Sequence, residues 1–205
     1  VDPVQWSIVK LKQDKKVVIV VFCGLENPLD IVMSATRQPL HVKDLGLQVN
    51  LHLWGNLHSS SNGVSETIMK KLREEDLTGR KVVVCGHSLG GAYATLFGLE
   101  LLKNHFEVKR VASFGGPQAV VPHPENTYWH KLNKFAVVYI NEFDVVPRLP
   151  SCKSWVLDIV PSIAGVSEEQ KRTWEECWDK HLAKYRHIGR ILFIGDEHDD
   201  AMPIK

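Results

Sequence analysis

Short runs of β-branched and apolar residues recur along this chain, and they constrain its fold more than any other feature. Each run is too short for a helix and lacks polar alternation, which is typical of strands buried on both faces. The runs lie at Val17 to Cys23, Lys81 to Cys85, Val108 to Phe114, Phe135 to Asn141 and Ile191 to Ile194. An earlier β-rich run, Trp6 to Lys12, is separated from the first by Gln13-Asp14-Lys15-Lys16, which predicts a hairpin.

Helical patterns separate the later runs. Val64, Ile68 and Leu72 share one face of a segment that follows the cap-type residues Ser61 and Asn62. Leu89 to Leu102 forms a second helical stretch, and its first residues are small. Strands that alternate with helices imply right-handed crossovers. We therefore expect an α/β fold with a mostly parallel central sheet and helices on both faces.

One region, Ser151 to Arg186, interrupts this alternation. We interpret 151–186 as a cap-like insertion in a single domain that spans 1–205. Its second half, Glu168 to Tyr185, is predicted to be helical, and one helical face would carry Trp174, Cys177, Trp178 and His181. We expect this face to pack on the sheet; substrate binding is the alternative.

Composition and charge exclude several classes of function. A chain of 205 residues with a formal net charge of +1 and no basic block has no electrostatic footprint for nucleic acid. The longest apolar run, Val17 to Phe22, is too short to span a bilayer. The chain lacks a charged-then-apolar leader and an Asn-x-Ser/Thr acceptor, so we expect a cytoplasmic or organellar rather than secreted protein. It starts at Val1 without Met, which leaves open that it belongs to a larger chain.

The cysteines, Cys23, Cys85, Cys152 and Cys177, show neither disulfide-scaffold density nor the C-x-x-C spacing of a zinc site. We expect reduced thiols and no metal site. Pairing of Cys152 with Cys177 in an oxidising compartment stays open.

The segment Cys85-Gly86-His87-Ser88-Leu89-Gly90-Gly91 follows a predicted strand and opens a predicted helix. A G-x-S-x-G sequence in this context is a nucleophile elbow, in which a strained turn exposes the serine Oγ and small neighbours avoid clashes. The backbone N–H of Leu89 would lie at the positive end of the helix, where an oxyanion develops. We therefore predict Ser88 as the nucleophile and Leu89 as an oxyanion donor.

A nucleophilic serine needs an acid and a base, which follow it in this order in such a fold. Asp144 lies in a loop after the run that ends at Asn141, and we prefer it to the nearby Glu142. It would fix the tautomer of the base and stabilise the imidazolium. Among the later histidines we predict His187 as the base, because it precedes Gly189 and the last strand, whereas His181 lies in a predicted helix. His198 lies in an acidic tail, which we interpret as a solvated charge run rather than a metal site.

With these residues in place, the chain resembles the class 3 lipase family over nearly its whole length. Four further segments match family motifs in order: Val20 to Gly24, Ser113 to Pro117, Asp144 to Pro150 and Tyr185 to Gly189. The resemblance implies hydrolysis of carboxylic esters, here lipid acyl esters, through an acyl-enzyme, with no metal or organic cofactor. It also implies transient contact with a membrane or lipid-droplet surface.

The resemblance also implies a second oxyanion donor at Leu25. The family usually has Thr or Ser at this position, where this chain has Leu25. It also usually has Arg two residues earlier, where this chain has Cys23. These departures predict weak activity. The segment from Glu26 to Leu40 takes the place of the family's lid, and its apolar residues, Leu29, Ile31, Val32 and Met33, either gate the site or stay buried.

Leu25 also leaves open a different class of function: an inactive lipase-like scaffold or signalling domain that works by binding a protein partner. Phospholipids and phenolic esters are further candidate substrates.

Overall fold

The computed structural model describes residues 4–58, 63–74, 77–152, 167, 169, 172, 175–176, 178 and 180–195. The strands are β1 (Trp6–Lys10), β2 (Val17–Phe22), β3 (Pro39–Val42), β4 (Leu47–Asn50), β5 (Lys81–His87), β6 (Val108–Phe114), β7 (Val120–Val121), β8 (Ala136–Asn141) and β9 (Arg190–Ile194). The helices are α1 (Pro28–Ala35), α2 (Leu51–His58), α3 (Val64–Leu72), α4 (Leu89–Lys103) and α5 (Thr127–Asn133), with short 3-10 helices η1 (Val146–Arg148) and η2 (Leu182–Lys184).

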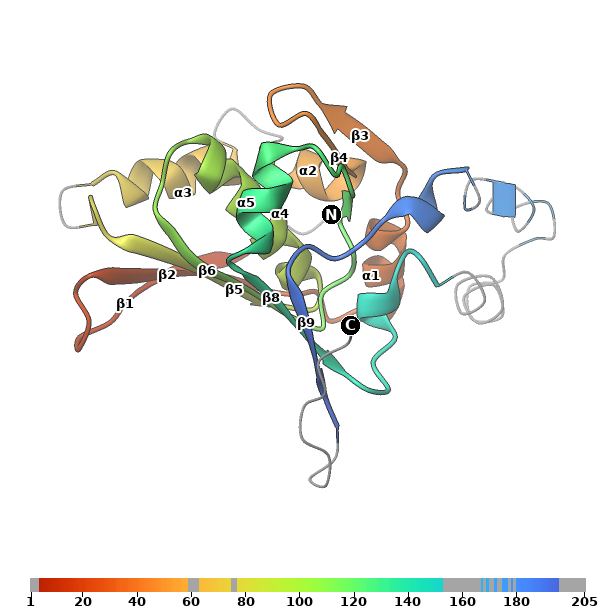
Figure 1. Ribbon diagram of the computed structural model, residues 1–205. Helices are drawn as coiled ribbons and strands as arrows, with labels where there is room; N and C mark the ends of the chain where they lie inside the picture. The colour runs from red at the N-terminus through yellow and green to blue at the C-terminus, as the bar shows by residue number, and fades with distance from the viewer. Residues whose placement is uncertain are drawn as a thin grey trace.

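A central six-stranded sheet has the order β1-β2-β5-β6-β8-β9 (Figure 1). β1 and β2 form an antiparallel hairpin, with Trp6 opposite Phe22. The other neighbouring pairs in this sheet are parallel. The predicted hairpin, the five strand-like runs and the mostly parallel sheet are therefore confirmed.

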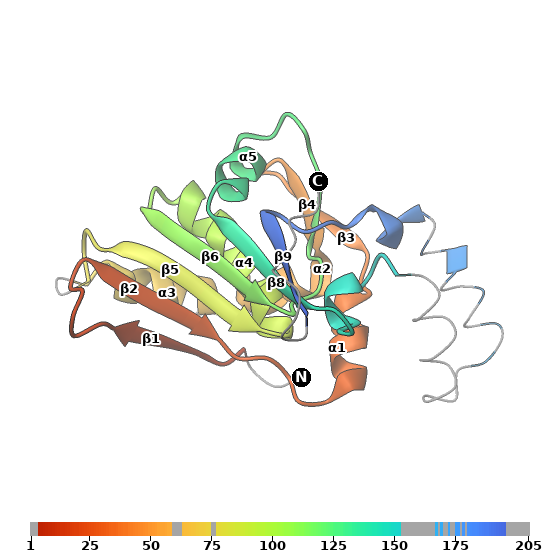
Figure 2. The ribbon, with the colours of Figure 1, turned by 60° about the horizontal axis from the view of Figure 1, so that its bottom comes forward.

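Helices α2 to α5 lie over one face of the central sheet. α4 contacts β2, β5 and β6, while α2, α3 and α5 contact α4. Figure 2 shows the strands in front of α3 and α4. From β2 to β9, each strand of the central sheet lies beside the previous one, always in the same direction across the sheet. Right-handed crossovers that all run in one direction place their helices on the same face of a sheet. Helices α2 to α5 therefore lie on one face of the central sheet, and the expected α/β fold with a mostly parallel sheet and helices is confirmed.

The burial of β5 follows this arrangement. Val82 and Val84, which face α4, are 1% and 0% exposed. The alternate residues Val83 and Cys85 are only half-buried. Arg110 of β6, in register with Val83, is exposed. The core of the molecule thus lies between the sheet and the helix layer.

A second, three-stranded antiparallel sheet, in the order β3-β4-β7, was not predicted. The helix predicted over Leu89 to Leu102 is confirmed as α4, and its small first residues are buried. The helix predicted around Ile68 is α3, but its N-cap is Gly63 and no side chain caps it. Ser61 and Asn62, the predicted cap residues, lie outside the described residues.

The described part of 151–186 packs on α1 rather than on the central sheet. Trp178, Leu182 and Tyr185 form an apolar cluster with Leu149 and with Val32 and Ala35 of α1. Trp174 and Cys177 lie outside the described residues, and with them any pairing of Cys152. No helix within the described ranges is both long and apolar enough to cross a membrane.

Candidate active site

Ser88 lies on the turn between β5 and α4. Its backbone has φ 54° and ψ −130°, a region that non-glycine residues rarely adopt. Its N–H donates to the carbonyl of Phe114 at 2.9 Å, which ties the turn to the end of β6. The residue is 6% exposed. Ser88 therefore has the strained strand-to-helix geometry of a nucleophile elbow.

The glycines of the elbow are required by close packing. A Cβ added to Gly86 would lie 2.3 Å from the carbonyl carbon of Gly90. One added to Gly90 would lie 2.3 Å from the carbonyl oxygen of Phe22. Real Cβ atoms do not approach other atoms so closely, so α4 can begin against β2 and β5 only if both positions are glycine.

Two backbone segments flank the nucleophile. A Cβ placed on Gly24 would lie 3.1 Å from Cβ of Ser88 and 2.7 Å from the carbonyl oxygen of His87, so the loop that carries Leu25 abuts the elbow. Leu89 is the first residue of α4, where backbone N–H groups have no partner inside the helix. The two predicted oxyanion donors, Leu25 and Leu89, thus lie on segments on either side of Ser88.

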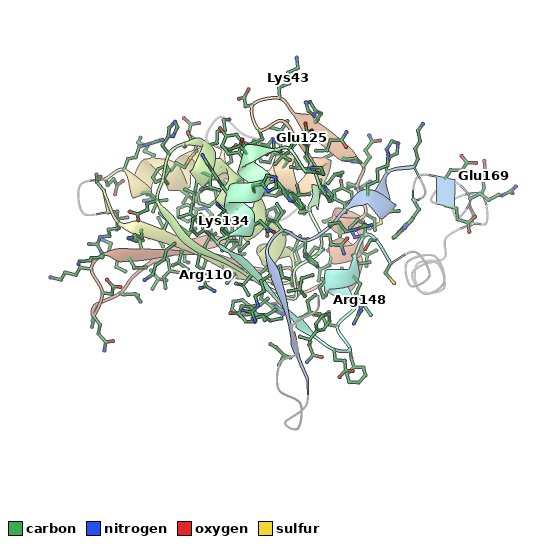
Figure 3. All side chains as sticks on the ribbon, in the orientation of Figure 1. Lys43, Arg110, Glu125, Lys134, Arg148 and Glu169 are labelled. Atoms are coloured by element: carbon green, nitrogen blue, oxygen red, sulfur yellow. The ribbon has the colours of Figure 1, made fainter. Side chains whose placement is uncertain are left out.

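Asp144 lies in the loop between β8 and η1. Its Oδ1 accepts a hydrogen bond from the N–H of Val146 at 2.9 Å, and Oδ2 lies so near Gly115 that a Cβ there would be 2.5 Å away. Arg148 (Figure 3) fixes the loop, because its Nη2 donates to the carbonyl of Glu142 at 2.8 Å and its Nε to that of Asp144 at 3.3 Å. Gly115 directly follows β6, whose last carbonyl binds Ser88. The structure therefore places Ser88 and Asp144 at the same carboxyl edge of the sheet.

His187 is not joined to Ser88. Its Nε2 donates a hydrogen bond to the carbonyl of Pro147 at 2.7 Å, and within the described part of the chain the Ser88 Oγ has no hydrogen-bond partner. Burial lowers the pKa of His187 to about 4, although the bond to Pro147 acts in the opposite direction. The hydrogen bond between Ser88 Oγ and His187 Nε2 that a base at His187 would need is therefore absent from this structure.

The contact with η1 gives the physical reason. His187 precedes β9, and Arg190 at the start of β9 pairs with Val137 near the start of β8. The ring of His187 reaches Pro147 of η1, three residues after Asp144. Its Nε2, the nitrogen that would take the proton of Ser88, is therefore occupied by the carbonyl of Pro147. His198, the next histidine in the sequence, lies outside the described residues.

The apolar residues of the predicted lid segment are held in place. In α1, Ile31, Val32 and Ala35 are buried and Met33 is half-buried; the side chain of Leu29 is outside the described set. Asn50 donates from Nδ2 to the carbonyls of Ser34 at 3.1 Å and Ala35 at 2.9 Å. Tyr185 donates from its hydroxyl to the carbonyl of Arg37 at 3.0 Å. These contacts keep the segment packed in this structure, as the buried alternative predicts.

A strained serine between a parallel strand and a helix, with a carboxylate at the same sheet edge, defines an α/β-hydrolase fold. The family model described as "Lipase (class 3)" matches residues 19–154, and the chain belongs to this family. None of the curated proteins compared matches the chain.

Solved structures of fungal lipases have the same fold. Lipase II from Rhizopus niveus is 18% identical, with a TM-score of 0.62 over 92% of this chain and 61% of that one. A Rhizomucor miehei lipase propeptide complex is 20% identical, with a TM-score of 0.64 over 98% and 57%. Mono- and diacylglycerol lipase from Aspergillus oryzae is 19% identical, with a TM-score of 0.60 over 92% and 58%. The chain thus spans about three fifths of the length of these lipases.

Proposed function

We propose that this chain carries the nucleophile and acid of a serine hydrolase that cleaves carboxylic esters, in particular lipid acyl esters. The observation that carries the proposal is Ser88: a buried hydroxyl without a hydrogen-bond partner among the described residues, on a strained elbow. Family membership over residues 19–154 supports the same chemistry.

In the proposed reaction Ser88 Oγ attacks the ester carbonyl while a histidine takes its proton. The carbonyl π electrons move to the oxygen, and the N–H groups of Leu25 and Leu89 stabilise this oxyanion. Collapse of the intermediate breaks the ester C–O bond, and the histidine returns the proton to the leaving alcohol. Water then attacks the acyl-enzyme by the same route, releasing the acid and restoring Ser88. Asp144 orients the histidine.

Two histidines compete for the role of base. His187 would have to leave the carbonyl of Pro147 and turn toward Ser88. His198 follows β9 in the sequence and lies outside the described residues. A base orients the attack and carries the proton, so its removal lowers turnover by about six orders of magnitude. Comparing His187→Gln with His198→Gln in an ester assay assigns the base, since only one of the two should lose this much activity.

A fluorophosphonate probe tests the nucleophile directly. We expect wild-type protein to be labelled and Ser88→Ala to be blank, whereas Ser7→Ala, an exposed serine of β1, should label like wild type. Hydrolysis of short p-nitrophenyl esters should follow the same pattern. Labelling that survives Ser88→Ala, or no labelling of any variant, would remove the hydrolase proposal and favour a binding role.

A further inference from the structure

His187 lies on a segment whose backbone is bonded on both sides of it. The N–H of Arg186 donates to the carbonyl of Val120 in β7 at 2.9 Å. The N–H of Gly189 donates to Oδ1 of Asn133, at the end of α5, at 2.9 Å. A residue between two such anchors cannot be displaced without breaking backbone hydrogen bonds, and each bond left unmade in the protein is costly. The imidazole therefore has a fixed support.

The ring of His187 caps the 3-10 helix η1. Carbonyls at the end of a helix have no partner inside it, and the carbonyl of Pro147 in η1 accepts from Nε2 of His187 at 2.7 Å. A carbonyl oxygen cannot donate, so Nε2 must carry a hydrogen. Burial lowers the pKa of His187 to about 4, so the ring is uncharged at neutral pH. Its other nitrogen, Nδ1, then has no hydrogen.

This tautomer is the opposite of the one that a base requires. The histidine of a triad accepts the serine proton at Nε2 while its Nδ1–H donates to the acid. In His187 the hydrogen is on Nε2 and is donated to a backbone carbonyl. Service as the base would require the ring to break the bond to Pro147, move its hydrogen to Nδ1 and turn toward Ser88. The arrangement thus suits holding the loop better than proton transfer.

The bond to Pro147 acts on the loop that carries Asp144. The N–H of Val146, next to Pro147, donates to Oδ1 of Asp144 at 2.9 Å, so η1 and the carboxylate are linked. Arg148 (Figure 3) holds the start of the same loop through two backbone carbonyls. His187 joins the other end of the loop to the segment before β9.

We propose that His187 is a positioning residue, whose ring holds η1 and thereby fixes the carboxylate of Asp144 where it can orient another histidine as the base. This inference rests on the proposed function, because the position of Asp144 matters for turnover only if it orients a base for Ser88. Without the bond to Pro147 the loop can shift, and a displacement of about 1 Å at a catalytic group lowers turnover about a hundredfold.

Substitutions at position 187 separate the two roles. His187→Gln keeps an N–H donor for the Pro147 carbonyl, whereas His187→Leu has none. For a positioning residue, kcat for a short p-nitrophenyl ester should fall by no more than about tenfold in His187→Gln and about a hundredfold in His187→Leu, with KM nearly unchanged. A base would lose about six orders of magnitude in both variants. That result, or wild-type turnover in His187→Leu, would overturn the proposal.

His130→Leu is the matched control. His130 is an exposed residue of α5 whose Nε2 also bonds a proline carbonyl, that of Pro124. The variant removes the same kind of contact away from the loop of Asp144, so kcat should stay at the wild-type value. Equal losses in His130→Leu and His187→Leu would contradict a specific effect on this loop.

Nuclear magnetic resonance tests the tautomer without catalysis. In isotope-labelled wild-type protein at neutral pH, the ring nitrogen signals that disappear in His187→Gln should show the hydrogen on Nε2. A hydrogen on Nδ1, or a charged ring, would overturn the proposal, and this readout does not require His187→Leu to fold. The expected tautomer in a protein that the fluorophosphonate probe does not label would contradict only the proposed function.

Discussion

Leu25 is the residue at which the proposed oxyanion hole departs from the Thr or Ser common in the family. Its loop abuts Ser88, so a hydroxyl at this position could support the oxyanion in addition to the backbone N–H. One oxyanion donor contributes about two to three orders of magnitude in turnover. We expect Leu25→Thr to raise kcat for a short ester at least about tenfold with little change in KM.

Leu25→Val is the matched control for this change, because Val has the shape of Thr without the hydroxyl. It should leave kcat near the wild-type value. Equal gains in both variants would mean that side-chain size, and not hydrogen bonding, limits the reaction.

His187 makes stability depend on pH. Its pKa in the native protein is about 4, below the ordinary value of 6.5, because the ring is buried. Above pH 6.5 the ring is neutral in both states and contributes no pH dependence. As the pH falls from 6.5 toward 4, the unfolded chain takes up a proton that the native protein does not, so the free energy of unfolding falls, by up to about 3 kcal/mol. Below pH 4 this effect is complete.

Urea unfolding at several pH values between 7.5 and 4 measures this dependence. His187→Gln keeps a donor for the Pro147 carbonyl but has no titrating group. As the pH falls from 6.5 toward 4, the free energy of unfolding of wild type should fall by more than that of the variant. Contributions from carboxylates are the same in both proteins and cancel in the difference. Parallel curves for the two proteins would show that the His187 ring is not buried as described.

The glycines at the start of α4 determine how closely this helix approaches the sheet. Gly90→Ala would place a Cβ 2.3 Å from the Phe22 carbonyl oxygen, so β2 or α4 must move. We expect the free energy of unfolding to fall by about 3 kcal/mol or more, with loss of probe labelling at Ser88.

Gly55→Ala is the matched helical substitution. Gly55 lies in α2, and a Cβ there meets nothing within 4 Å. Because glycine is a poor helix former, this variant should be more stable than wild type by up to about 1 kcal/mol. Urea unfolding of both variants checks the contrast, and similar effects of the two substitutions would contradict the tight elbow.

Sequence reasoning found the elements with strong local signals. The apolar runs of β2, β5, β6 and β8 and the Gly-x-Ser-x-Gly turn were predicted because an apolar strand and a strained turn each restrict residue types over several consecutive positions. The small sheet was missed because β3 and β4 have four residues each and β7 has two. Pairing of such short strands depends on partners far apart in the sequence, not on local pattern.

At the site, Ser88 and Asp144 lie at one edge of the sheet, and their catalytic roles stay predictions. Each of the two follows a strand, so strand direction fixes their edge. His187 precedes a strand, and its motif alone did not determine where its ring points. The bond to Pro147 depends on how η1 folds back, which no local pattern reports.

Over the whole molecule, the crossovers all run in one direction across the central sheet, so its two faces differ in burial. The helix layer covers the face that carries Val84, whereas the face that carries Val83 is only half-buried. Val83 and Val84 are adjacent in β5 and have the same β-propensity. Replacing each of them with Ala therefore measures how deeply its face of the sheet is buried. Val84→Ala should lower the free energy of unfolding by about 2 kcal/mol, because two methyl groups leave a filled core. Val83→Ala should lower it by less than about 1 kcal/mol.

Urea unfolding of both variants at two protein concentrations measures these losses of free energy. Equal losses that grow with concentration would show that a second copy covers the Val83 face. Equal losses that do not depend on concentration would show that the chain itself covers it.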